Sequence, residues 1–180
     1  FYSEAREINI CLSGMTLTNG YSTGNGGAIQ MAKSGNIALQ DIVITNSYGM
    51  IGAGFYAYKA GKITIENCHY INNSGSYGGG VALPECEDVF INDSSFLGNE
   101  ARTYYGGGLY LAYSNGTINR SIFTDNTSIN YGGGIGLRDL PDSVNSYHVD
   151  ISECTLSNNT AKYGGGIFTT KVFTTIYSST

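Results

Sequence analysis

The sequence predicts an all-β protein, a right-handed parallel β-helix (a solenoid) of about six coils with about 26 residues per coil. Two short motifs recur in step with each other, apolar residues alternate with period two around both, and no stretch of ten residues shows helical periodicity. We therefore expect residues 1–180 to form a single β-helix segment, with coils that begin near Leu12, Leu39, Ile65, Ile91, Ile118 and Ile151.

The first motif is a tyrosine followed by three glycines and an apolar strand. It begins at Tyr77, Tyr105, Tyr131 and Tyr163, and two degenerate copies precede it at 26–29 and 52–55. Its last small residue marks each copy, and the spacing of these markers is nearly constant until a longer final interval: Ala28, Gly54, Gly80, Gly108, Gly134 and Gly166. Glycine lets the chain turn sharply and lets neighbouring backbones approach, as stacked coils require.

The second motif reads Ile-x-x-Cys/Ser-x-aromatic-x-x-Asn, as in residues 65–73. Its aromatic residues are expected to stack as an inward column, Tyr70, Phe96 and Phe123. Its last residue predicts a ladder in which asparagine adopts the left-handed conformation and bonds the next coil through its side-chain amide: Asn73, Asn99, Asn126 and Asn159. The tyrosines of the first motif predict a further column, whose burial the sequence leaves open.

The four cysteines do not predict disulfides or a metal site. Cys68 and Cys154 share one repeat position three coils apart, which is roughly 14 Å in stacked strands and beyond disulfide reach. No CxxC pair or histidine cluster accompanies them. We expect Cys11, Cys68, Cys86 and Cys154 to act as small buried residues in an inward-facing slot.

Composition argues against several classes of function. The chain has nine Lys plus Arg and a net charge of −5, so we expect no nucleic-acid partner. No apolar run is long enough to cross a bilayer, so we expect no membrane span in this segment. No repeat position stacks Asp upon Asp, and neither a nucleophile elbow nor a calcium-binding nonapeptide occurs. We therefore expect no enzyme activity and no cofactor.

One insertion interrupts the period. The stretch 134–151, from the glycine marker to the next inward isoleucine, is longer than its counterparts 80–91 and 108–118. Insertions in a solenoid form loops on one face, and such loops often carry recognition. The candidate recognition residues are Arg138, Asp139, Asp142, Tyr147 and His148, although a plain surface loop is the simpler interpretation.

Six N-x-S/T sequons offer sites for N-glycosylation in a secreted eukaryotic protein. Asn126 is a poor acceptor because it belongs to the predicted ladder. The remaining candidates are Asn72, Asn92, Asn115, Asn119 and Asn158.

The paired motifs resemble the repeats of the bacterial polymorphic outer membrane proteins, which are described by a Gly-Gly-Ala-Ile box and a Phe-x-x-Asn box. Here the boxes stand at residues 26–29, 96–99 and 123–126, and the resemblance covers roughly residues 12–168. It implies a β-helix exposed at a cell surface, since several members of that family act as adhesins.

We therefore expect an extracellular or cell-surface structural or adhesive β-helix without catalysis. It is expected to continue into more protein or to stack end to end into filaments, and its ligand would be a host surface or a glycan. The alternative is a carbohydrate-binding or polysaccharide-cleaving β-helix of the pectin-lyase-like type, using the 138–148 loop and exposed tyrosines: Tyr56, Tyr58, Tyr110 and Tyr113.

Overall fold

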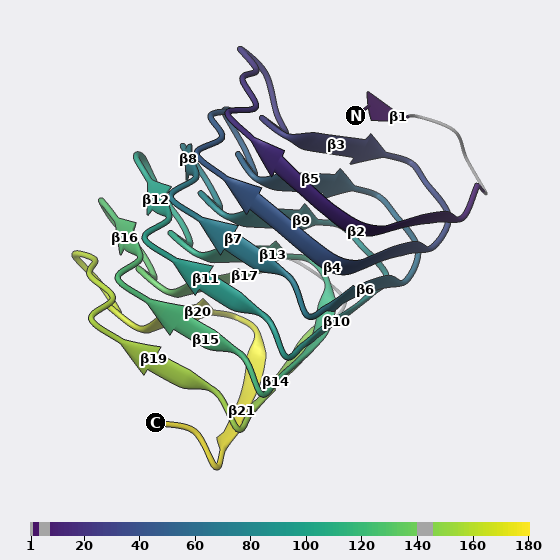
Figure 1. Cartoon of the computed structure of the whole chain (residues 1–180). Helices are drawn as coiled ribbons and strands as arrows, with labels where there is room; N and C mark the ends of the chain where they lie inside the picture. Colours follow the sequence, from purple (N-terminus) through teal and green to yellow (C-terminus); the bar gives the residue numbers. More distant parts are fainter. Residues whose placement is uncertain (1, 4–7, 140–145) are drawn as a thin grey trace.

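The computed structural model describes residues 2–3, 8–139 and 146–180, and in this part of the chain every strand pairing is parallel. The chain winds as a solenoid whose coils stack along one axis (Figure 1). One sheet holds one strand of each coil: β1 (Tyr2–Ser3), β3 (Ile29–Ala32), β5 (Phe55–Tyr58), β9 (Val81–Pro84), β13 (Leu109–Ala112), β17 (Ile135–Arg138) and β20 (Ile167–Thr170).

A second sheet covers the opposite side of the coil. Its first column is β2 (Ile10–Thr18), β4 (Ile37–Thr45), β6 (Ile63–Glu66), β10 (Asp88–Asn92), β14 (Asn115–Asn119), β18 (His148–Ser152) and β21 (Phe173–Tyr177). Its second column, continued from β2 and β4, is β7 (His69–Ile71), β11 (Ser95–Leu97), β15 (Ile122–Thr124) and β19 (Thr155–Ser157). A short third sheet holds β8 (Ser74–Gly75), β12 (Glu100–Ala101) and β16 (Thr127–Ser128).

The core lies between the sheets and is filled by alternate residues of each strand. Val81 and Leu83 of β9 are fully buried inside, and the same inward positions recur in β13 and β17. On the second sheet, the six apolar residues near which the coils were predicted to begin pair with one another from coil to coil: Leu12, Leu39, Ile65, Ile91, Ile118 and Ile151. The period-two pattern therefore determines which side chains form the core.

Four columns of left-handed residues form the corners. The corner residues have a positive φ, and their backbone N–H groups donate to carbonyls of the following coil, as Gly78 does to Tyr105 at 2.9 Å. Three of the columns contain mostly residues other than glycine, such as Asn, Asp, Lys, Glu and Arg, because the tight turn and not the residue type defines the position. The YGGG motif supplies the fourth column through its first glycine.

The asparagine ladder lies one residue after such a corner. Asn99 accepts hydrogen bonds at Oδ1 from the backbone N–H and the side-chain amide of Asn73, both at 3.0 Å. Its own amide donates to Tyr70 O at 2.8 Å and to Asn126 Oδ1 at 3.0 Å. The expected left-handed conformation of the ladder is wrong: the positive φ belongs to the preceding residue, Asn72, Gly98, Asp125 or Asn158, while the ladder side chains point into the core.

An aromatic column fills the interior beside this ladder. Tyr70, Phe96 and Phe123 are fully buried and stack with ring centroids 5.1 and 4.4 Å apart. Within the described residues the Tyr70 hydroxyl has no hydrogen-bond partner.

Three of the four cysteines are buried. The thiols of Cys68, Cys86 and Cys154 face backbone carbonyls, such as that of Glu66 at 3.2 Å from Cys68. Cys11 contradicts the expectation because it is exposed. It pairs with Ala38 at an outward position of β2, between the inward residues Ile10 and Leu12.

Candidate functional site

The outside of the coil carries a tyrosine ridge, formed by Tyr77, Tyr104, Tyr105, Tyr131 and Tyr163. The ring centroids of Tyr105 and Tyr131 are 4.8 Å apart, and those of Tyr131 and Tyr163 are 5.3 Å apart. Each inner ring therefore has its faces covered by its neighbours and offers mainly its edge to solvent. Tyr163, at 47% exposed, is the most open ring of the ridge.

The outward face of β5 and β13 lies under this ridge. Tyr56 and Tyr110 are only 8% and 6% exposed, so the expectation that they are exposed sugar platforms is wrong. They pack with Ala82 beneath the partly buried rings of Tyr77 and Tyr105. Burial raises the pKa of the Tyr110 phenol to about 12, although the neighbouring Arg138 opposes this. This surface is a second, external hydrophobic cluster.

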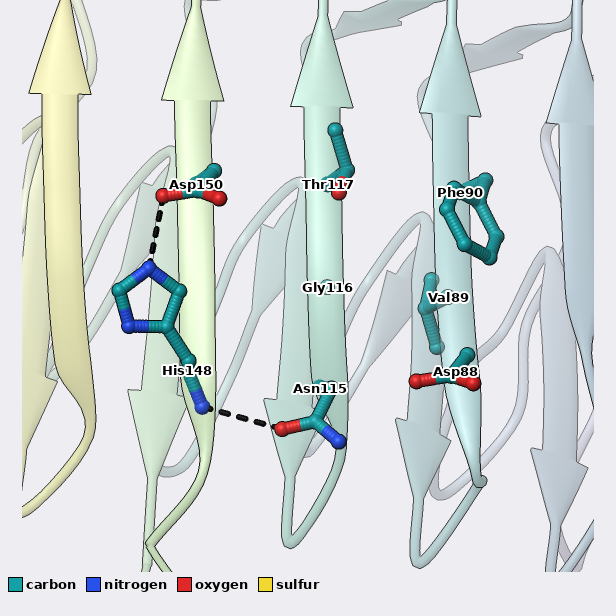
Figure 2. A pocket seen from close by; sticks show the side chains of 8 residues that line it. All are labelled: Asp88, Val89, Phe90, Asn115, Gly116, Thr117, His148 and Asp150. Atoms are coloured by element: carbon teal, nitrogen blue, oxygen red, sulfur yellow. Dashed lines mark hydrogen bonds and ion pairs between the residues drawn. The ribbon is translucent and has the colours of Figure 1, made fainter.

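A groove lies on the outward face of the second sheet, across β10, β14 and β18 (Figure 2). Its hollow has a volume of about 160 Å³. One row of side chains, Asp88, Asn115 and His148, forms its lower edge in Figure 2. The row two residues further along the strands, Phe90, Thr117 and Asp150, forms the upper edge. Gly116, which has no side chain, lies on the central strand between the two rows.

Hydrogen bonds fix one wall of this groove. His148 Nε2 lies 2.8 Å from Asp150 Oδ1, and the backbone N–H of His148 donates to Asn115 Oδ1 at 3.1 Å. Thr175 Oγ1 approaches the same Nε2 at 3.3 Å. Because both contacts use one ring nitrogen, the imidazole does not link an acid to a hydroxyl as a catalytic triad does.

The opposite wall is formed by Phe90 and Asp88. The ammonium of Lys62, the residue before β6, lies over the Phe90 ring, 4.6 Å from its centroid. Within the described part of the chain, the carboxylate of Asp88 has no hydrogen-bond or ion-pair partner. The groove thus combines an aromatic wall with acidic, amide and hydroxyl groups.

The structure separates the residues of the predicted recognition loop. Arg138 places its guanidinium 5.4 Å from the centre of the Tyr105 ring, and Asp139 is buried. Tyr147 meets Tyr113 edge-on at 6.4 Å, and only His148 lines the groove. Asp142 lies outside the described residues.

Sequence reasoning missed the other polar residues of the groove. Asp88 and Asn115 share the register of His148, while Thr117 shares that of Asp150. The signal that could have found them is the repeat itself. Aligning the coils on Ile91, Ile118 and Ile151 and comparing the outward positions would have placed these polar residues in two neighbouring rows.

The sequons differ in exposure. Asn72, Asn115 and Asn158 are exposed, whereas Asn92 and Asn119 are half-buried, and Asn119 Oδ1 accepts a hydrogen bond from Ser152 Oγ at 3.0 Å. Asn126 is fully buried in the ladder. Exposure thus favours the first three as acceptors.

The described residues offer neither a metal site nor a membrane-spanning helix. They contain no group of three or more His, Cys, Asp or Glu side chains placed to hold a metal ion. They also contain no helix long and apolar enough to cross a membrane.

Comparison with known proteins identifies the architecture. A family model described as a right-handed beta helix region matches residues 27–180. The chain belongs to this right-handed β-helix family. No curated protein and no solved structure matches it significantly. The match gives the hand of the helix and supports the β-helix part of the resemblance to the polymorphic outer membrane proteins, but it assigns no activity to this right-handed β-helix.

Proposed function

We propose that this chain is a structural or adhesive β-helix segment of an extracellular or cell-surface protein, and that it acts as a rigid rod without catalysis. The observation that carries the proposal is the continuous stacking of polar and aromatic side chains along the axis. The asparagine ladder runs without a break from Asn73 to Asn159. Such ladders stiffen a rod, whereas they add nothing to a reaction.

The groove supports a non-catalytic role as well. Its two carboxylates, Asp88 and Asp150, lie two coils and two residues apart, which is roughly 12 Å between Cα atoms in a parallel sheet. Among the described residues, His148 Nε2 contacts the Asp150 carboxylate and, at 3.3 Å, the Thr175 hydroxyl, and neither contact activates a nucleophile. This arrangement is better suited to holding a ligand than to cleaving one.

Electron microscopy of the native protein tests the structural role. We expect straight rods of constant width, or filaments in which a further coil, from the same chain or from a second copy, covers β20 and β21. Exposed side chains at that end, Phe173 at 65% and Ile176 at 51%, favour such a cover. Flexible or globular particles would contradict the rod.

Secretion is tested through the sequons. If the protein passes through a eukaryotic secretory pathway, we expect glycans at Asn72, Asn115 and Asn158. The intact mass would then fall on glycosidase treatment. The triple variant in which these asparagines are changed to Gln is the control, because its mass should not change.

A second candidate function is carbohydrate binding in the groove. The observation that favours it is the Phe90 wall beside the Asn115 amide and the Thr117 hydroxyl, and this function excludes a glycan on Asn115 because that amide lines the groove. A glycan array probed with the wild-type protein and with Phe90→Ala tests this function. Binding that disappears in the variant supports it, and a blank array removes it.

A further inference from the structure

We propose that the groove binds a primary ammonium group, with the Asp88 and Asp150 carboxylates as its counter-charges and the Phe90 ring as its apolar wall. This inference does not depend on the structural role of the rod, and it specifies the charge of a ligand for the second candidate function. It rests on the hollow over β14 and on the groups that surround it.

The hollow is placed between two negative charges. Asp88 stands at its β10 edge and Asp150 at its β18 edge, with the Gly116 backbone between them (Figure 2). A group seated over β14 is one coil, or about 5 Å, from each neighbouring strand. An ammonium group there would be attracted by both carboxylates through space and would donate a hydrogen bond directly to one of them, because their Cα atoms are roughly 12 Å apart.

Asp88 is the stronger anchor of the two acids. Asp150 already contacts the His148 ring at 2.8 Å, whereas Asp88 has no such partner in the described part of the chain. Its neighbour on β14, Asn115, uses one of the two acceptor positions of its Oδ1 for the His148 N–H. An incoming cation therefore finds a free carboxylate at the β10 edge.

The protein's own lysine shows that this wall accepts a cation. Lys62, the residue before β6, holds its ammonium 4.6 Å from the Phe90 centroid. Aromatic faces attract cations through the ring quadrupole. A cation in the hollow would lie next to this same ring, which lines it, so Lys62 acts as an electrostatic competitor of the ligand.

The same charges disfavour an acidic partner. A polymer of uronic acids would bring its carboxylates next to Asp88 and Asp150, where like charges repel. A polymer or peptide that carries primary amines suits the groove. The amine of an amino sugar and the amine of a lysine side chain supply the same chemistry.

Calorimetric titration at low ionic strength tests the inference with two pairs of probes. The first pair is the glucosamine tetramer and its fully N-acetylated form, and the second is Nα-acetyl-lysine methylamide and its norleucine analogue. We expect each amine to bind at least threefold more tightly than its neutral counterpart, with the difference reduced at about 0.3 M salt. The preferred amine identifies the source of the ligand.

Three variants separate this site from a general charge effect. Asp88→Asn should weaken amine binding by about threefold to fivefold, as expected for loss of one exposed charge pair. Lys62→Met should strengthen it. Glu153→Gln removes the same charge from an exposed corner outside the groove and should leave binding unchanged.

The outcomes are distinct. If the neutral tetramer binds as well as the amine, carbohydrate binding stands and the ammonium site is wrong. If no probe binds, the ammonium site is also wrong and the glycan array alone decides the second function. An equal effect of Asp88→Asn and Glu153→Gln would refute the site as well, because binding would then follow net charge.

Discussion

Asn99 sits in the middle of the ladder, and its replacement by alanine tests what holds the coils together. The side chain is fully buried and takes part in four hydrogen bonds. Asn99→Ala removes all of them. It leaves the backbone N–H of Asn73 and the carbonyl of Tyr70 without these partners, in an interior that water does not reach.

The expected cost follows from these bonds. A buried hydrogen bond contributes about 1 kcal/mol net, and an orphaned buried group costs about 1–3 kcal/mol. We therefore expect the free energy of unfolding to fall by about 3–5 kcal/mol. Asn159→Ala is the matched control because Asn159 is only partly buried and makes three bonds, to Asn126 and Phe123. Its loss should cost less, about 1–2 kcal/mol, since water can replace part of these bonds.

Urea unfolding followed by circular dichroism measures both values. The slope of the free energy of unfolding against urea concentration must be the same in all three proteins. A changed slope would mean that the β-helix has lost its cooperativity and unfolds coil by coil, so the free energies could not be compared. If Asn99→Ala costs less than about 1 kcal/mol, or no more than Asn159→Ala, the ladder is not a main source of stability. Stability would then lie in the apolar core.

Three further predictions concern other buried positions. Tyr70→Phe should raise the free energy of unfolding by about 1 kcal/mol, because it removes a buried hydroxyl without a partner; a lower midpoint in urea would contradict this. In the native protein, a thiol reagent should modify Cys11 and spare the other cysteines, since burial raises the pKa of their thiols, that of Cys86 to about 12; four fast-reacting thiols would show that the coils open. Gly133→Ala should lower the free energy of unfolding by about 1–3 kcal/mol, because its Cβ would lie 2.5 Å from the backbone oxygen of Thr160. Gly24→Ala is the control: its Cβ would have its nearest contact at 3.7 Å, so the midpoint of thermal unfolding should hardly change.

The period of the sequence was enough to predict the fold. Two motifs in step predicted the stacked coils, and the alternation around Val81 and Leu109 predicted which side chains point inward. The conformation of the corners was not predictable in the same way. Asparagine is common both at left-handed positions and in ladders. The sequence alone therefore does not show which of Asn72 and Asn73 takes the left-handed conformation and which joins the ladder.

The candidate site was much less accessible to prediction. The groove joins Asp88, Asn115 and His148 from three coils, and each is an ordinary polar residue in its own part of the sequence. The tyrosines were misjudged for a related reason. Whether Tyr110 is exposed depends on the side chains of neighbouring coils that fold over it, and no local pattern reports this.

The corner hydrogen bonds give the rod a polarity. The corner residues from Asn19 to Glu153 that bond a neighbouring coil all do so in the same sense. The corner N–H donates toward the C-terminal end of the rod, and the carbonyl that accepts it belongs to the following coil. The ladder has the same order, because each Oδ1 receives its hydrogen bonds from the preceding coil. A head-to-tail copy would continue these bonds in the same sense, whereas two like ends related by a two-fold axis would not. A copy that continued these corner and ladder bonds would add head to tail, and growth by such a heterologous contact has no built-in limit.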